Sequence, residues 1–185
     1  AAAANQAPVN SVPGAQTATT DQPFAFTAYR GNRISISDAD AGANAVKVTL
    51  TVDKGTLTLL NPDPSGRITY LSGDGTEDAS MTFTGTVSDV NTALEWISYR
   101  PEAAFLGAAV LTITTDDVGN VGLNGALSDT DTVSITVDAV PSFSASPTYQ
   151  TLPSALDIQL DNDGKQIASV TAGIDFINEM QVLAD

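Results

Sequence analysis

Two aspartates separated by a single residue, Asp38 and Asp40, form the clearest candidate site in the sequence. They precede Gly42 and the stretch 45–52, in which apolar and polar residues alternate without a break. In extended backbone, side chains two positions apart point to the same side, so both carboxylates project together. Such an oxygen-rich pair suits a hard cation, but it equally suits a solvated turn, because Asp and Gly favour turns for backbone reasons. Both interpretations stay open on local grounds.

Calcium is the cation that these residues favour. It accepts six to eight oxygen ligands in irregular geometry, whereas zinc prefers histidine and cysteine, and the chain contains neither. The spacing does not fit an EF-hand, because position 49 is threonine where that loop needs glutamate. A second acidic cluster, 74–78, is predicted to be a solvated loop, with a weak surface cation site as the alternative.

The composition excludes several classes of partner. The formal net charge is −15 and only seven residues are Lys or Arg, so no basic patch is available for nucleic acid or an anionic membrane. No apolar run approaches the roughly 20 residues that cross a bilayer, so membrane insertion is not expected. The plausible charge partners are cations.

An enzyme is not expected. Without histidine or cysteine, Ser–His and Cys–His nucleophiles are excluded. Two carboxylates can hydrolyse glycosides, but short loops leave little room for a cleft, so a carboxylate-based hydrolase accessory domain is a remote alternative. A glycan- or protein-binding module is the nearer alternative, because loop chemistry varies independently of the fold.

The elements that must position the aspartates are mostly strands. Abundant Thr, Ser and Val with 6% aromatic residues favour β-structure. Strands are predicted at 24–29, 45–52, 56–60, 67–71, 81–86, 109–115 and 132–137. Gly55 predicts a hairpin between the second and third of these. One short helix is predicted over about 89–97, capped by Ser88 or Asp89, with Val90, Ala93, Leu94 and Ile97 on its apolar face.

Many short strands separated by turns predict an all-β sandwich. We expect a linker at 1–9, a sandwich module at 10–140, and a partial second module or extended tail at 141–185. The aspartate pair recurs in that tail with the same internal spacing, as Asp161 and Asp163, before another glycine and another alternating stretch. The sequence therefore predicts a tandem array whose second member is cut short.

Four segments occur in an order that resembles a known family: 36–40, 88–101, 111–119 and 128–137. Together they resemble the cadherin-like repeats of very large bacterial surface and type I-secreted proteins, which are akin to chondroitin sulfate proteoglycan repeats. The resemblance implies a Greek-key β-sandwich of cadherin/Ig type in a non-catalytic adhesin, located outside the cell or on the bacterial surface.

The resemblance also implies that calcium (Ca²⁺) binds at the module ends and stiffens the array. Neighbouring repeats of the same chain would be the first partners, and a cell-surface protein or glycan would be the adhesion partner. Matched by position, one predicted metal site takes Asn5, Asp38, Asp40, Asp116 and Asp117. The corresponding downstream site takes Asp138, Asp161 and Asp163.

Overall fold

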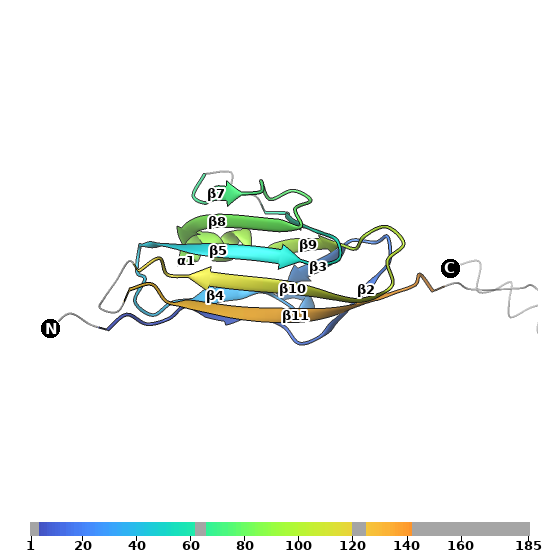
Figure 1. Ribbon diagram of the computed structural model, residues 1–185, viewed down its shortest axis with the longest axis horizontal. Helices are drawn as coiled ribbons and strands as arrows, with labels where there is room; N and C mark the ends of the chain where they lie inside the picture. The colour runs from blue at the N-terminus through green and yellow to red at the C-terminus, as the bar shows by residue number, and fades with distance from the viewer. Residues whose placement is uncertain (1–3, 62–65, 120–124, 142–185) are drawn as a thin grey trace, which may run out of the picture. The chain divides into compact units, whose positions relative to one another are not determined.

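The computed structural model describes residues 4–61, 66–119 and 125–141 (Figure 1). The chain divides into two compact units, Ala1–Ser142 and Phe143–Asp185, and the second lies outside the described residues. The predicted partial second module falls in that second unit and stays a prediction. The architecture below is that of the first unit alone.

Six strands form the larger sheet, labelled along the front of Figure 1. Across the sheet they are β2 (Gln16–Thr19), β11 (Ser128–Asp138), β10 (Gly107–Asp116), β5 (Ala45–Val52), β8 (Ser80–Thr86) and β7 (Thr69–Ser72). Neighbours are antiparallel except β11 and β2, which are parallel. Several neighbours are far apart in the sequence, as a Greek key requires.

The second layer lies behind this sheet in Figure 1. It contains a three-stranded sheet of β3 (Phe24–Thr27), β9 (Trp96–Arg100) and β6 (Thr56–Leu59), and a pair formed by β1 (Val9–Ser11) and β4 (Ser35–Ser37). The described residues also form a 3₁₀ turn, η1 (Ala28–Arg30), and one α-helix, α1 (Val87–Ala93). Neither helix is long enough to cross a membrane.

The hydrophobic core lies between the two layers. In β5 every second residue is buried, and its neighbours on the other face are at least partly exposed. Leu50 and Leu111 from the larger sheet meet Phe26 and Ile97 from the smaller one in a single cluster. Each such fully buried side chain contributes about 1.5–3 kcal/mol. The prediction of an all-β sandwich with one short helix is confirmed.

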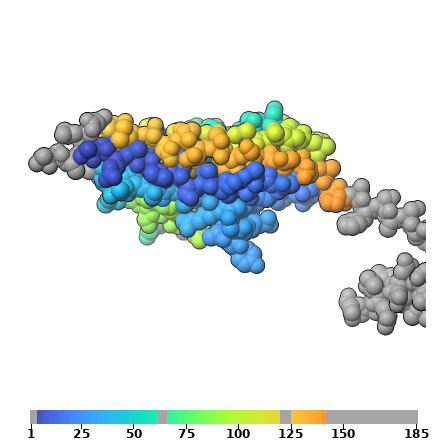
Figure 2. All heavy atoms as spheres, turned by 90° about the horizontal axis from the view of Figure 1, so that it is seen from below, coloured from blue at the N-terminus to red at the C-terminus, as the bar shows by residue number. Residues whose placement is uncertain are grey.

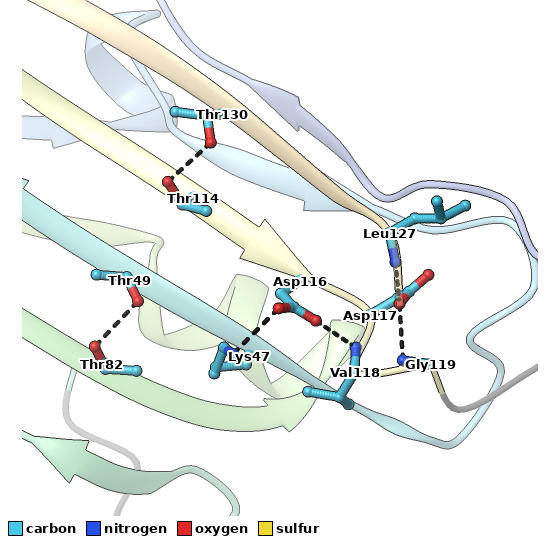
Figure 3. Close-up of polar contacts among 10 residues, drawn as sticks. All are labelled: Lys47, Thr49, Thr82, Thr114, Asp116, Asp117, Val118, Gly119, Leu127 and Thr130. Carbon is cyan, nitrogen blue, oxygen red and sulfur yellow. Dashed lines mark hydrogen bonds and ion pairs between the residues drawn. The ribbon is translucent and has the colours of Figure 1, made fainter. Parts of the chain in front are cut away.

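The outer face of the larger sheet is rich in threonine. Thr49 and Thr82 lie opposite each other on β5 and β8, with their hydroxyl oxygens 3.0 Å apart, and Thr114 and Thr130 pair in the same way on β10 and β11 (Figure 3). Branched side chains favour extended backbone, and each cross-strand pair adds about 0.2–1 kcal/mol. Exposed positions therefore support the same register as the buried ones.

The helix begins and ends earlier than predicted. The Thr86 hydroxyl accepts the backbone N–H of Asp89 and caps α1, which ends at Ala93 instead of position 97. Ile97 belongs to β9 and pairs with Phe26. It fitted the helical period because an inward-facing residue on the next strand fills the same core as the helix face.

The predicted hairpin between β5 and β6 is wrong. β5 pairs with β10 and β8 in the larger sheet, whereas β6 pairs with β9 in the smaller one. The chain crosses between layers at Gly55, whose φ is 131°. A Cβ there would lie 2.2 Å from the carbonyl oxygen of Arg100, so the crossing passes too close to β9 for any side chain.

Tyr99 anchors this crossover. Its ring is buried in the core, and its hydroxyl donates to the carbonyl oxygen of Lys54 at 2.5 Å. Burial raises the pKa of Tyr99 to about 12, with smaller contributions from the carboxylates of Asp53 and Glu102. The hydroxyl therefore stays protonated, and remains a donor, throughout the neutral pH range.

The start of the chain supplies strands to both layers. β1 pairs with β4 in the second layer, and after Pro13 and Gly14 the chain reaches the larger sheet as β2, beside β11. Figure 2 shows these first residues in blue running along the orange β11. β2 was not predicted, because Ala18 is its only buried residue and its four positions carry no alternating apolar signal.

We expect Gly55→Ala to destabilise the module by about 3 kcal/mol or more, because the new methyl group collides with the β9 backbone at a φ that L-residues avoid. Urea unfolding monitored by the fluorescence of Trp96 measures this. Gly14→Ala is the matched control, since nothing lies within 4 Å of its added Cβ. Equal stability of the two variants would contradict the described crossover.

Candidate functional site

Asp117 is a buried carboxylate just beyond the end of β10. Inward-facing positions of β10 continue as Thr115 and then Asp117, which is only 4% exposed. Its Oδ1 accepts the backbone N–H groups of Gly119 and Leu127, each at 2.9 Å (Figure 3). Its Oδ2 accepts the side-chain amide of Asn5 at 2.6 Å. The carboxylate thus draws three separate segments together.

Two opposing effects act on the pKa of Asp117. Burial alone raises this pKa, because it disfavours the charged form. The backbone N–H groups of Leu127 and Gly119 and the amide of Asn5 lower it more, so the net pKa lies below the usual aspartate value. Asp117 therefore stays ionised at neutral pH, and the dipoles of the surrounding N–H groups stabilise its charge.

Asn5 joins the beginning of the chain to this carboxylate. Its Nδ2 also donates to the carbonyl oxygen of Gly125 at 2.7 Å, and the residue is only 8% exposed. Both partners are acceptors, so the orientation of the amide group is determined. If the amide were flipped, Asn5 Oδ1 would face the oxygens of Asp117 and Gly125 and could not bond to them. With both N–H groups directed at protein, Oδ1 is the Asn5 atom left to meet a cation.

The next residue connects the first aspartate pair to the same place. The backbone N–H of Gln6 donates to Asp40 Oδ2 at 3.0 Å. Asp38 Oδ1 accepts the N–H groups of Asp40 and Ala41 at 3.1 and 3.0 Å, which closes an Asx turn. Residues 5 and 6 therefore bring Asp117 and the Asp38–Asp40 turn to one end of the sandwich.

Asp38 Oδ2 is the carboxylate oxygen among the described residues that is buried without a partner, as are Asn10 Nδ2 and Thr20 Oγ1 among uncharged groups. It is buried from solvent and has no hydrogen-bond partner among the described residues, although its carboxylate is only partly covered as a whole. A buried acceptor without a donor costs about 1–3 kcal/mol, and more when it is charged. Such an atom calls for an ion or an ordered water.

The helix holds the Asp38 turn in place. Asn91 of α1 donates to the carbonyl oxygen of Ile36 at 2.8 Å and accepts the N–H of Ile36 at 2.9 Å. These reciprocal bonds satisfy the backbone N–H and C=O groups of Ile36, which lies in the short strand β4 two residues before Asp38. The helix was predicted only as a core element, so this role of Asn91 was missed.

Asp116 faces away from the other aspartates. It lies opposite Lys47 on the outer face of the larger sheet, with Asp116 Oδ2 3.1 Å from Lys47 Nζ (Figure 3). Its Oδ1 accepts the N–H of Val118 at 2.7 Å. Neighbouring residues in extended backbone point to opposite faces, so Asp116 and Asp117 do not act as one pair.

The downstream site was predicted at the other junction of the module, and only Asp138 of its three residues lies in the described part of the chain. Asp138 is exposed at the far end of β11, ten register positions from Ser128, which lies opposite Asp116. That separation is roughly 34 Å along an antiparallel strand. Asp161 and Asp163 lie outside the described residues.

One contributing carboxylate was not predicted. Asp129 Oδ2 accepts the backbone N–H of Asn10 at 2.7 Å, and Asn10 Oδ1 accepts the hydroxyl of Thr115 at 2.6 Å. These contacts fasten β1 to β10 and β11. The alternation of β11 was the available signal, because it places Asp129 on the inner face with Val133 and Ile135.

Among the described residues, no three acidic side chains converge closely enough to form a cluster that holds a metal ion unaided. A cation here would therefore need carbonyl oxygens or water beside the aspartates. No protein-family model matches the chain, and no curated protein is significantly similar to it. The resemblance to cadherin-like repeats stays a prediction from motifs.

The low pKa of Asp117 makes the stability of the module depend on pH. As the pH falls, the unfolded chain takes up the proton first, near pH 4, so the contribution of Asp117 is complete above that value. It is then lost as the pH falls through the lower pKa of the folded state. Each unit of difference in pKa corresponds to about 1.4 kcal/mol.

We expect Asp117→Asn to lower stability at neutral pH and to flatten the loss of stability between about pH 4.5 and 2.5. Urea unfolding at a series of pH values measures both effects. Asp131→Asn, on the partly exposed start of β11, is the control and should leave the profile of the parent protein almost unchanged. An unaltered profile for Asp117→Asn would contradict the described hydrogen bonds from Asn5, Gly119 and Leu127 to Asp117.

Proposed function

We propose that residues 10–140 form a non-catalytic sandwich module of an extracellular bacterial adhesin or surface protein, with calcium bound at the end where the leading segment (residues 4–8) meets the module. The observation that carries the calcium proposal is the buried Oδ2 of Asp38, which has no hydrogen-bond partner within residues 4–61, 66–119 and 125–141. The four-segment resemblance to cadherin-like repeats supports the adhesin setting and the tandem array.

The chemistry of the end favours calcium over other cations. Asp38 Oδ2 and the carboxylate of Asp40 offer hard oxygen ligands within one turn, and Asn5 Oδ1 lies on the adjoining leading segment. A set of few carboxylates completed by carbonyls and water suits the irregular coordination of calcium. The moderate charge suits the weak affinities, about 10⁻⁴–10⁻³ M, of extracellular modules.

Asp117 and Asp116 have different roles in this proposal. Asp117 already accepts three N–H groups, so it orients Asn5 and need not bind the ion directly. Asp116 is paired with Lys47 on the other face. We therefore assign the ion to Asp38 and Asp40, with Asn5 beside them.

A cation would stabilise this end where covalent links cannot. The chain has no cysteine, so a secreted module of this kind cannot use disulfides. An ion bound only by the folded state contributes free energy by mass action. It also neutralises part of a strongly acidic chain, and it would stiffen the joint to the preceding repeat.

We expect calcium at about 10 mM to stabilise the protein by roughly 1.5–3 kcal/mol, which is the mass-action gain for a site of 10⁻⁴–10⁻³ M affinity. Thermal unfolding with added calcium, compared with EDTA, measures the shift. Asp38→Asn should abolish most of it, because Asn keeps the acceptor of the Asx turn and removes only the charged oxygen.

Asp116→Asn is the matched control, since its carboxylate faces Lys47, and it should keep the full calcium shift. Magnesium at the same concentration separates a specific ion from general screening, because it demands stricter octahedral geometry. A parent protein whose unfolding is indifferent to calcium, or an Asp38→Asn variant with an unchanged shift, would contradict the assignment.

A further inference from the structure

We propose that Asn5 fastens the leading segment to the module without any cation, through what we call the Asn5 latch: the bonds from Asn5 Nδ2 to Asp117 Oδ2 and to the carbonyl oxygen of Gly125. The inference deepens the proposed function, on which it rests for the idea that residues 4–8 are a joint between repeats. In this inference, contacts within the protein determine the direction in which the leading segment leaves the module.

The latch is built as a buried polar contact. Asn5 is almost fully covered although it stands four residues before β1 and belongs to no strand. Its two bonds, at 2.6 and 2.7 Å, are short, and one acceptor is charged. Bonds to charged groups are the stronger class, and burial increases what is lost when one partner is removed.

The rest of the leading segment follows the same pattern. Gln6 is exposed, but its backbone N–H donates to Asp40, and Pro8 is buried two residues before Asn10, whose N–H donates to Asp129. Asp117, Asp40 and Asp129 therefore each accept an N–H group from residues 5–10. These contacts fix the position of the segment along the end of the sandwich without help from a metal ion.

A latched segment changes what calcium has to do. If the joint were free in the absence of calcium, the ion would have to order several residues, and part of its binding free energy would be lost to that ordering. With the latch closed, the turn at Asp38 and the amide of Asn5 already lie together. Calcium then adds stability to a joint whose direction is set beforehand.

Nuclear magnetic resonance on the whole chain in EDTA tests the latch. In the parent protein, residues 5–8 should show heteronuclear NOE values like those of the strands, and the Gln6 N–H should exchange slowly. Asn5→Ala should speed that exchange about ten- to a hundredfold, the effect of losing a bond to a charged group. Asn5→Asp, which removes the donors and sets a second carboxylate against Asp117, should speed the exchange at least as much.

Gln6→Ala is the matched control, because it removes an exposed side chain and leaves the backbone donor in place. It should exchange as the parent does. A leading segment that is mobile in EDTA and becomes ordered only with calcium would overturn the latch while leaving the calcium site intact. A segment that is ordered in EDTA, with no response to calcium, would support the latch and contradict the calcium proposal.

Discussion

The buried carboxylate of Asp117 is the constraint on which this end of the molecule depends. Removing an ionised group from water costs several kcal/mol unless hydrogen bonds replace the lost hydration. Here the replacement comes from the backbone at Gly119 and Leu127 and from the side chain of Asn5, which lies 112 residues before Asp117 in the sequence. The need to satisfy one anion therefore holds the leading segment, the end of β10 and the start of β11 together.

Strand alternation made most of the core predictable, because the inward residues of β5, β8, β10 and β11 repeat with a period of two. The same rule could not say which sheet a strand joins, so β6 was assigned to a hairpin when Gly55 sends it to the other layer. Nor could it find β2, which pairs with β11 across more than a hundred residues and buries little. Sheet membership and distant pairing depend on tertiary contacts that local pattern does not encode.

The candidate site was predictable to a similar depth. The spacing of Asp38 and Asp40 marked them as a pair, and the resemblance to cadherin-like repeats, matched by position, grouped them with Asp117. The hydrogen bonds of residues 5 and 6 place the three carboxylates at one end. Alternation also separates Asp116 from Asp117, a consequence that treating them as one pair overlooked. The partners of each carboxylate were out of reach, because Gln6, Asn91 and the N–H of Leu127 reach the site only after distant segments fold together.

The carboxylates at this end fall into two groups by the way in which their charge is satisfied. Asp117 and Asp129 accept N–H groups on the inner side, where burial strengthens each bond, so they determine structure. Asp38 uses one oxygen for its turn and leaves the other buried without a donor, which no arrangement of N–H groups among the described residues relieves. Among the described residues, Asp38 Oδ2 is thus the buried carboxylate oxygen that lacks a hydrogen-bond donor, which is why the proposed cation is assigned to it. The way in which a carboxylate is satisfied therefore distinguishes a candidate ligand from a structural aspartate better than acidity alone does.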